Sequence, residues 1–263
     1  MMSTRARILP AIVTAVAAAL LITSDASAAV TLPSPHAKFD YQIGGAYTPP
    51  AGVQVVSRDH DASPAAGLYN ICYVNAFQAQ PGTESEWGDL LLRDAAGNIV
   101  YDGQWGEALL DIRTNDKRQR IANKVNGWID QCAAKGFKAI EPDNYDSYDR
   151  SKNLLTTSQA QTYIRLLSAH AHGAGLAIAQ KNTAELAGNR VANGLDFAVA
   201  EECGLYEECG DYTDAFGTHV IVIEYDEEGL EYACANWGDE LSIVMRDENV
   251  TAPGSGEYVY RTC

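Results

Sequence analysis

Basic residues are scarce in this sequence. Its 263 residues include 19 Lys and Arg against 35 Asp and Glu, so the formal net charge is −16. Proteins that bind nucleic acids or dock on anionic membranes carry a basic surface, so we expect neither a nucleic acid nor a membrane as a partner. The rest of the composition, 46% hydrophobic and 21% charged, is typical of a globular chain long enough to form one α/β barrel.

The sequence also lacks the short motifs of several enzyme classes. It has no G-x-G-x-x-G, Walker A, H-E-x-x-H or G-x-S-x-G pattern, which argues against dinucleotide chemistry, nucleotide hydrolysis, zincin proteolysis and α/β-hydrolase esterase chemistry. No C-x-x-C pair is present, and His170 and His172 are two positions apart, so they do not share a helix face. We therefore expect neither a metal nor a cofactor, and we interpret the two histidines as polar residues near the end of a helix.

Long apolar runs are missing except near the N-terminus. Two arginines precede an apolar stretch over residues 8–22, and Ala26-Ser27-Ala28 follows as a small-residue cleavage signal. This pattern predicts a secretory signal peptide over residues 1–28, and hence a secreted, extracellular protein. A membrane anchor is the alternative, but the run is short and rich in alanine for a span of about 20 residues. We expect residues 29–263 to form one α/β barrel domain.

All six cysteines lie after the predicted signal peptide. An even number of cysteines in an exported chain predicts three disulfides, although six cysteines allow 15 connectivities. A short local loop, and a bond that holds the end of the chain against fraying, are the simplest choices. They give the pairs Cys203–Cys209 and Cys234–Cys263, and by elimination Cys72–Cys132.

Short apolar runs rich in β-branched residues alternate with helical patterns along the chain. Such alternation produces a parallel sheet with covering helices, and eight strands in a chain of this length predict an α/β fold of the (β/α)8 TIM-barrel type. Residues 76–111 have no clear period, and we interpret them as a long insertion after the third strand. The strand candidates are Phe39–Ile43, Val53–Ser57, Tyr69–Asn75, Lys138–Glu141, Leu176–Gln180, Phe197–Ala200, His219–Glu224 and Leu241–Met245.

Capping residues mark the starts of four expected helices. The clearest follows Thr114, because Ile121, Val125 and Ile129 recur on one face before Gly136 ends the pattern. The other helices are expected to begin near Thr157, Thr183 and Asp226.

Carboxylates follow several of the predicted strands. In an α/β barrel the active site lies at the carboxyl ends of the strands, where Asp143, Glu201 and Glu224 would gather. Taken singly, such acids are explained by solvation or helix capping, as Glu202 and Asp226 are. Three strand ends that each carry a carboxylate favour a shared cleft, and two carboxyl groups flanking a bond are the minimum equipment for glycoside hydrolysis.

Four segments carry a family resemblance through their order and spacing. They are Glu-Pro-Asp-Asn-Tyr-Asp at 141–146, Gln-Lys-Asn at 180–182, Val-Ala-Glu-Glu-Cys at 199–203 and Ile-Glu-Tyr at 223–225. Together they resemble glycoside hydrolase family 114, the endo-α-1,4-polygalactosaminidase family, and residues 39–47 are similar to its secreted actinobacterial members. The resemblance implies a (β/α)8 barrel that cleaves α-1,4-linked galactosamine polymers internally, without a metal.

The resemblance also implies roles for individual residues. Asp143 corresponds to the nucleophile or base, and Glu201, two positions before Cys203, corresponds to the acid/base. We expect a retaining monomer whose acidic cleft attracts a cationic or partly acetylated galactosamine polysaccharide. The alternatives are a non-catalytic glycan-binding barrel and a hydrolase of another N-acetylated or mixed amino-sugar polymer. The residues expected to line the sugar subsites are Asp40, Asn144, Asp146, Lys181, Asn182, Glu202, Glu224 and Tyr225.

Overall fold

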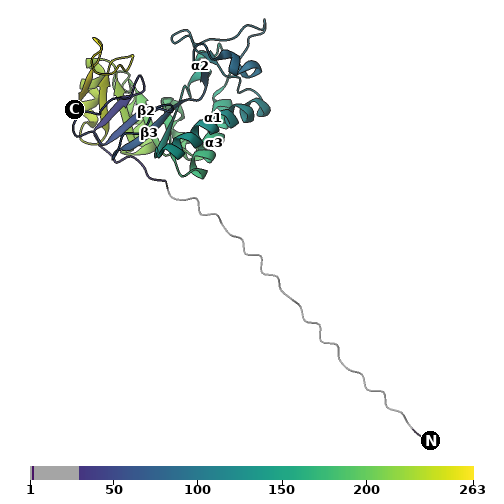
Figure 1. Ribbon diagram of the computed structural model, residues 1–263, viewed down its shortest axis with the longest axis horizontal. Coiled ribbons are helices and arrows are strands. Elements are labelled where there is room, and N and C mark those ends of the chain that lie inside the picture. Colours follow the sequence, from purple (N-terminus) through teal and green to yellow (C-terminus); the bar gives the residue numbers. More distant parts are fainter. Residues whose placement is uncertain (1, 3–29) are drawn as a thin grey trace.

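The structure is a computed structural model that describes Met2 and residues 30–263. The predicted signal peptide, Met2 apart, therefore lies outside the described residues. Eight parallel strands of the described part form a barrel with helices on its outer side (Figure 1), which confirms the predicted (β/α)8 fold. Within the described part, no helix is long and apolar enough to cross a membrane.

The strands follow one another around the barrel in the order of the chain. Neighbouring strands pair in parallel from β1 to β10, and β11 pairs antiparallel with β10. The ion pair between Asp40 of β1 and Arg246 of β10 joins the first and last parallel strands. The strands are β1 Phe39–Gln42, β2 Val55–Asp59, β3 Tyr69–Asn75, β6 Ala139–Asp143, β7 Ala177–Lys181, β8 Phe197–Glu201, β9 Val220–Glu224, β10 Ser242–Arg246 and β11 Tyr260–Thr262.

The helices begin and end largely where the capping residues predict. Thr114 accepts a hydrogen bond from the backbone of Lys117 at the start of α1, and Gly136, with φ at 95°, ends that helix. Thr156 forms a capping box before α3, and Asp226 caps α6. The helices are α1 Asn115–Lys135, α2 Ser147–Arg150, α3 Thr157–Gly173, α4 Arg190–Asn193, α5 Cys209–Phe216 and α6 Glu227–Trp237.

The helix expected after Thr183 is not a regular α-helix. Thr183 has φ at 63° and its side chain caps nothing, and the chain forms the 3-10 segment η3, Ala184–Asn189, before the single turn of α4. A left-handed residue turns the chain sharply after β7, and Gly188 weakens helix formation within this segment. Sequence periodicity also missed α5 and the short strand β11.

Residues 76–114 lie between β3 and α1. They contain the two-stranded antiparallel sheet of β4, Gln78–Ala79, and β5, Ala108–Leu109, together with the 3-10 turns η1, Glu84–Glu86, and η2, Gly88–Leu90. In Figure 1 this segment extends beside α2 at one end of the barrel. It therefore adds a wall to the face where the strands end.

Alternate residues of each strand point into the barrel, because side chains of a strand alternate between its two faces. One apolar cluster fills the interior, and a second lies between the strands and the helices. The interior series can be extended along each strand to its end, as in Ala139, Glu141 and Asp143 on β6, or Phe197, Val199 and Glu201 on β8. This register decides which strand-end residues face the open end of the barrel.

Three disulfides tie the outer elements together, in the pairing that the sequence favoured. Cys72–Cys132 joins β3 to α1, and Cys203–Cys209 closes the loop between β8 and α5. Cys234–Cys263 attaches the last residue to α6. The predicted connectivity is confirmed.

Candidate active site

Two carboxylates converge at the carboxyl ends of β6 and β8. Asp143 is the last residue of β6 and Glu201 the last of β8, with side chains 18% and 22% exposed. The ammonium of Lys181, the last residue of β7 between them, lies 3.5 Å from Asp143 Oδ1 and 3.3 Å from Glu201 Oε2. The separation of these two oxygens therefore cannot exceed the sum of those two distances.

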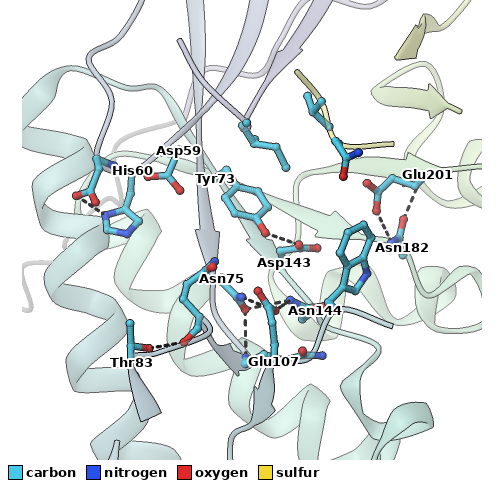
Figure 2. A pocket seen from close by; sticks show the side chains of 18 of the residues that line it. Asp59, His60, Tyr73, Asn75, Thr83, Glu107, Asp143, Asn144, Asn182 and Glu201 are labelled. Atoms are coloured by element: carbon cyan, nitrogen blue, oxygen red, sulfur yellow. Dashed lines mark hydrogen bonds and ion pairs between the residues drawn. The ribbon is translucent and has the colours of Figure 1, made fainter. Parts of the chain in front are cut away.

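Hydroxyl and amide donors orient each carboxylate. Tyr73 on β3 donates to Asp143 Oδ2 at 2.6 Å. Tyr225, just after β9, donates to Glu201 Oε1, while the Asn182 side chain donates to Glu201 Oε2 at 2.9 Å and accepts from the Glu201 backbone. Figure 2 shows the Tyr73–Asp143 contact near the centre of the view and the Asn182–Glu201 contacts to its right. Both acids are thus held as oriented hydrogen-bond acceptors.

Electrostatics favour the ionised form of Asp143. Burial disfavours a charged carboxylate, but the Lys181 ammonium and the Tyr73 hydrogen bond outweigh it and lower the pKa of Asp143. Nearby, burial together with the charges of Asp143 and Glu201 raises the pKa of Asp146 to about 6, against the opposing effect of Arg150. The site therefore contains one carboxyl group whose pKa is lowered, Asp143, and one whose pKa is raised, Asp146.

A second polar cluster borders Asp143 on the side of the insertion. Asn75, at the end of β3, donates to Glu107 Oε2 at 2.7 Å and its amide oxygen accepts from Asn144 at 3.0 Å. Figure 2 shows the amides of Asn75 and Asn144 directed at Glu107. Burial raises the pKa of Glu107. Arg150 of α2 donates to Asn144 and forms an ion pair with Asp146.

The residue after each of the strands β6, β7 and β8 has left-handed backbone geometry. Asn144 has φ at 65°, Asn182 at 52° and Glu202 at 57°. Asparagine tolerates this region, whereas glutamate is strained in it, and such strain is frequent at functional sites. The turns redirect the chain at once, so that the amides of Asn144 and Asn182 reach back over the strand ends.

The carboxylates open into a cleft of about 580 Å³. Its lining is strongly acidic, with Arg150 as the one Lys or Arg among the lining residues. Trp105 of the insertion also lines it and is 46% exposed. The acidic lining residues are Asp59, Asp61, Glu86, Glu107, Asp143, Asp146, Glu201 and Glu248.

Four of the expected subsite residues line this cleft, and four do not. The lining includes Asn144, Asp146, Asn182 and Tyr225 as well as the two proposed catalytic acids. The side chains outside the lining are Asp40, Lys181, Glu202 and Glu224.

Strand register explains most of this difference. Asp40 and Glu224 have the opposite parity from the interior residues of their strands, and both are fully buried. Asp40 pairs with Arg246, and Glu224 accepts from the backbone of Gly204, so both side chains lie outside the cleft.

Glu202 and Lys181 lie outside the cleft lining for different reasons. Glu202 follows the last residue of β8, where its left-handed backbone turns the chain, and it lies outside the cleft lining. Burial raises its pKa. Lys181 points inward but is only 1% exposed, beneath the two acids. It is therefore a contact of the carboxylates and not part of the cleft surface.

Sequence reasoning missed several side chains that the structure brings to the site. Tyr73 and Asn75 continue the interior series of β3, so the alternation of that strand contained a signal for them. Glu107, Trp105 and Arg150 lie in the insertion or in α2, where no strand or helix period marks an inward-facing position.

Two groups within the described residues bring metal-ligand atoms within 4.8 Å of one another. One is Asp59, His60 and Asp61 at the rim of the cleft, three neighbours of which Asp61 is exposed. The other contains Glu224 with Cys203 and Cys209, whose sulfurs are bonded to each other. Neither group has the closed set of ligands typical of a structural metal site.

A (β/α)8 barrel with an oriented acid pair at its strand ends, open to an acidic and aromatic cleft, belongs to the class of barrel glycoside hydrolases. Residues 21–263 match the family model described as Glycoside-hydrolase family GH114. The chain is therefore a glycoside hydrolase and a member of that family. This confirms the resemblance carried by the strand-end motifs.

Solved structures share the fold at low sequence identity. The crystal structure of Aspergillus fumigatus Ega3 in complex with galactosamine has a TM-score of 0.71 and 21% identity, and the alignment covers 89% of this chain and 97% of that one. The glycoside hydrolase domain of PelA from Pseudomonas aeruginosa has a TM-score of 0.58 and 12% identity, with 87% and 99% covered. None of the curated proteins compared with the chain matches it.

Proposed function

We propose that this protein is a secreted, endo-acting hydrolase of α-1,4-linked galactosamine polymers, with Asp143 as nucleophile and Glu201 as acid/base. One observation carries the proposal: the two carboxylates, from different strands, contact the same Lys181 ammonium at the floor of an open acidic cleft. Two carboxyl groups that face one cleft are the minimum equipment of glycoside hydrolysis.

In the first step, Asp143 attacks the anomeric carbon. The new bond joins that carbon to a carboxylate oxygen, the glycosidic carbon–oxygen bond breaks, and the leaving oxygen takes the proton of Glu201. The lowered pKa of Asp143 suits this role, because a nucleophile must be ionised. Tyr73 holds one of its oxygens, which leaves the carboxylate in one orientation.

In the second step, Glu201 takes a proton from water. The water oxygen bonds to the anomeric carbon and the bond to Asp143 breaks, which restores both carboxyl groups. Two displacements retain the configuration. Retaining enzymes hold their acids about 5–5.5 Å apart and inverting enzymes about 6.5–9.5 Å. The contact of one oxygen of each acid with the same ammonium supports the shorter, retaining separation.

The lining of the cleft supports a cationic sugar polymer as substrate. Deacetylated amino sugars carry ammonium groups, and an acidic cleft raises their local concentration. An exposed indole such as Trp105 offers the flat apolar surface on which the face of a sugar ring packs. The Ega3 structure, which shares this fold, holds galactosamine.

Residues 29–263 would form the secreted enzyme, acting as a monomer in the extracellular space. The three disulfides support an oxidising compartment, since such bonds persist outside the reducing cytosol. Mass spectrometry of the protein recovered from culture medium would test the cleavage after Ala28.

The experiment scores release of reducing ends from a panel of polysaccharides: deacetylated, partly acetylated and fully acetylated galactosamine polymers, and chitosan. Asp143→Asn and Glu201→Gln should each lose about 10²- to 10⁴-fold in rate while remaining folded. The control Glu202→Gln, which changes the neighbouring acid outside the cleft, should keep most of the activity. Full activity in both site variants would contradict the assignment.

The same panel separates the two alternatives. Saturable binding without new reducing ends indicates a glycan-binding barrel. Hydrolysis of chitosan or of fully acetylated polymer in preference to galactosamine indicates a different amino-sugar substrate.

A further inference from the structure

Lys181 occupies an unusual place beneath the acid pair. Its side chain is 1% exposed, and it does not belong to the lining of the cleft. Its ammonium nevertheless contacts both Asp143 and Glu201. A group in this position touches the catalytic acids from below without reaching a bound sugar.

A buried network fixes the ammonium from the interior of the barrel. Lys181 Nζ donates to Glu141 Oε1 at 2.9 Å and to the Tyr41 hydroxyl at 2.8 Å. Tyr41 in turn donates to Glu141 Oε1, and Ser57 donates to Glu141 Oε2 at 2.5 Å. Glu141 therefore has both oxygens occupied, and the ammonium cannot move away from the acids without breaking two hydrogen bonds.

The ammonium stays charged in this environment. Burial disfavours it, but the carboxylates of Asp143, Glu141 and Glu201 outweigh burial and raise the pKa of Lys181 well above its ordinary value. Lys181 is therefore a fixed cation, not a base or a nucleophile.

Some of the other groups around Asp143 favour its ionised form, and others disfavour it. Tyr73 from β3 and Arg150 from α2 favour its carboxylate. The carboxylates of Glu107 before β5 and of Asp146 before α2 add negative charge on the cleft side. Three more groups face Lys181. They are Glu201 from β8, Tyr225 from the end of β9 and Tyr41 from β1. Among the described residues, Lys181 is the cation that forms ion pairs with both acids.

We propose that Lys181 is a positioning residue, whose buried ammonium holds Asp143 and Glu201 at one separation and keeps Asp143 an anion under acidic conditions. This inference rests on the proposed function. The effect of the Lys181 ammonium on the two acids differs between the two steps of the reaction. Once Asp143 has bonded to the sugar and lost its charge, the ammonium keeps its contacts with Glu141 and Glu201, so Glu201 stays in position while it receives the proton of water.

The test uses variants that separate charge from packing. Lys181→Met/Glu141→Gln removes the cation without leaving a buried unpaired carboxylate, and the glutamine amide pairs with both Tyr41 and Ser57, its oxygen accepting from one hydroxyl and its NH2 donating to the other. Lys181→Arg keeps the charge in a larger shape. Lys138→Met is the matched control, because Lys138 is exposed and lies just before the first residue of β6, at the opposite end of that strand from Asp143. Thermal unfolding checks that each variant is folded.

The pH profile of kcat/KM is the first readout. An opposite charge at this distance lowers the pKa of a carboxyl group by about 1–3, so the acid limb of Lys181→Met/Glu141→Gln should move to higher pH by at least about one unit. Below pH 5 this gives at least about a tenfold loss relative to the wild type. Lys181→Arg and Lys138→Met should keep the acid limb in place. An unmoved limb in the double variant, or a change confined to KM, would overturn the inference.

A second readout does not depend on activity. Carbon-13 NMR titration of the Asp143 carboxyl, assigned by its loss in Asp143→Asn, should show a higher pKa in the double variant than in the wild type. Equal titration would overturn the role of Lys181. An inactive wild type with a shifted titration would instead count against the proposed function while supporting the positioning role.

Discussion

The pH dependence of stability should carry the signature of one buried carboxyl group, Glu224. Its side chain is fully buried at the end of β9, where Oε1 accepts from the backbone of Gly204 and Oε2 has no hydrogen-bond partner among the described residues. Burial raises its pKa from 4.5 to about 7. Because each tenfold change in proton affinity is worth about 1.4 kcal/mol, the fold favours the protonated form by about 3 kcal/mol.

The direction in which stability changes with pH follows from the protons that Glu224 binds in the folded and in the unfolded chain. Below pH 4.5 the carboxyl group is protonated in both the folded and the unfolded chain, so its contribution to stability is complete. Between pH 4.5 and about 7 the unfolded chain gives up this proton while the folded chain keeps it, and stability falls as the pH rises. Above about pH 7 the group is ionised in both states, and no further loss arises from it.

Urea unfolding of the wild type and of Glu224→Gln at pH 4.5, 5.5, 6.5 and 7.5 measures this contribution. The difference between the two free energies of unfolding cancels the other titrating groups, and it should change by about 3 kcal/mol in favour of the glutamine variant across the series. Glu228→Gln, exposed in the first turn of α6, is the control for the same substitution at an exposed position. A difference for Glu224→Gln that is independent of pH would refute the reasoning.

The remaining predictions concern the cleft and the disulfides. Trp105→Ala should lower kcat/KM about tenfold, mainly through KM, because the exposed indole lines the cleft and an aromatic contact contributes about 1 kcal/mol or more; an unchanged KM for the polymer would contradict a stacking role. The bond between Cys72 and Cys132 closes a loop of 60 residues, so replacing both by alanine should lower the free energy of unfolding by about 4 kcal/mol. The bond between Cys203 and Cys209 spans 6 residues and its loss should cost about 2 kcal/mol, so chemical denaturation that reverses this order would count against a loop-entropy origin.

Much of the fold could be predicted because its signals are local. Each of the eight parallel strands overlaps an apolar run visible in the chain, and Thr114 and Asp226 cap their helices as hydroxyl and carboxylate side chains do elsewhere. The acid pair was also accessible, since Asp143 and Glu201 end two such strands and the ends of parallel strands meet at one face of a barrel.

Register and insertions were harder to predict. A shift of one residue moves a side chain from the interior of the barrel to its outer face, and this places Glu224 against Gly204 instead of in the cleft. Glu202 is separated from Glu201 by the left-handed turn just after β8. Trp105 and Glu107 lie in a segment without strand or helix period, so their approach to Asp143 depends on the packing of β4 and β5.

The sequence by itself determined the order of strands and helices, the acidic charge and the two acids at the strand ends, because each of these depends on residue type or on neighbours along the chain. The tertiary structure alone decided the role of Lys181. An ammonium 40 positions from Glu141 and 140 from Tyr41 becomes the shared partner of two carboxylates only when closure of the barrel brings β1, β6, β7 and β8 around one interior. Electrostatic interactions depend on distance in space, and distance in space is what the fold supplies.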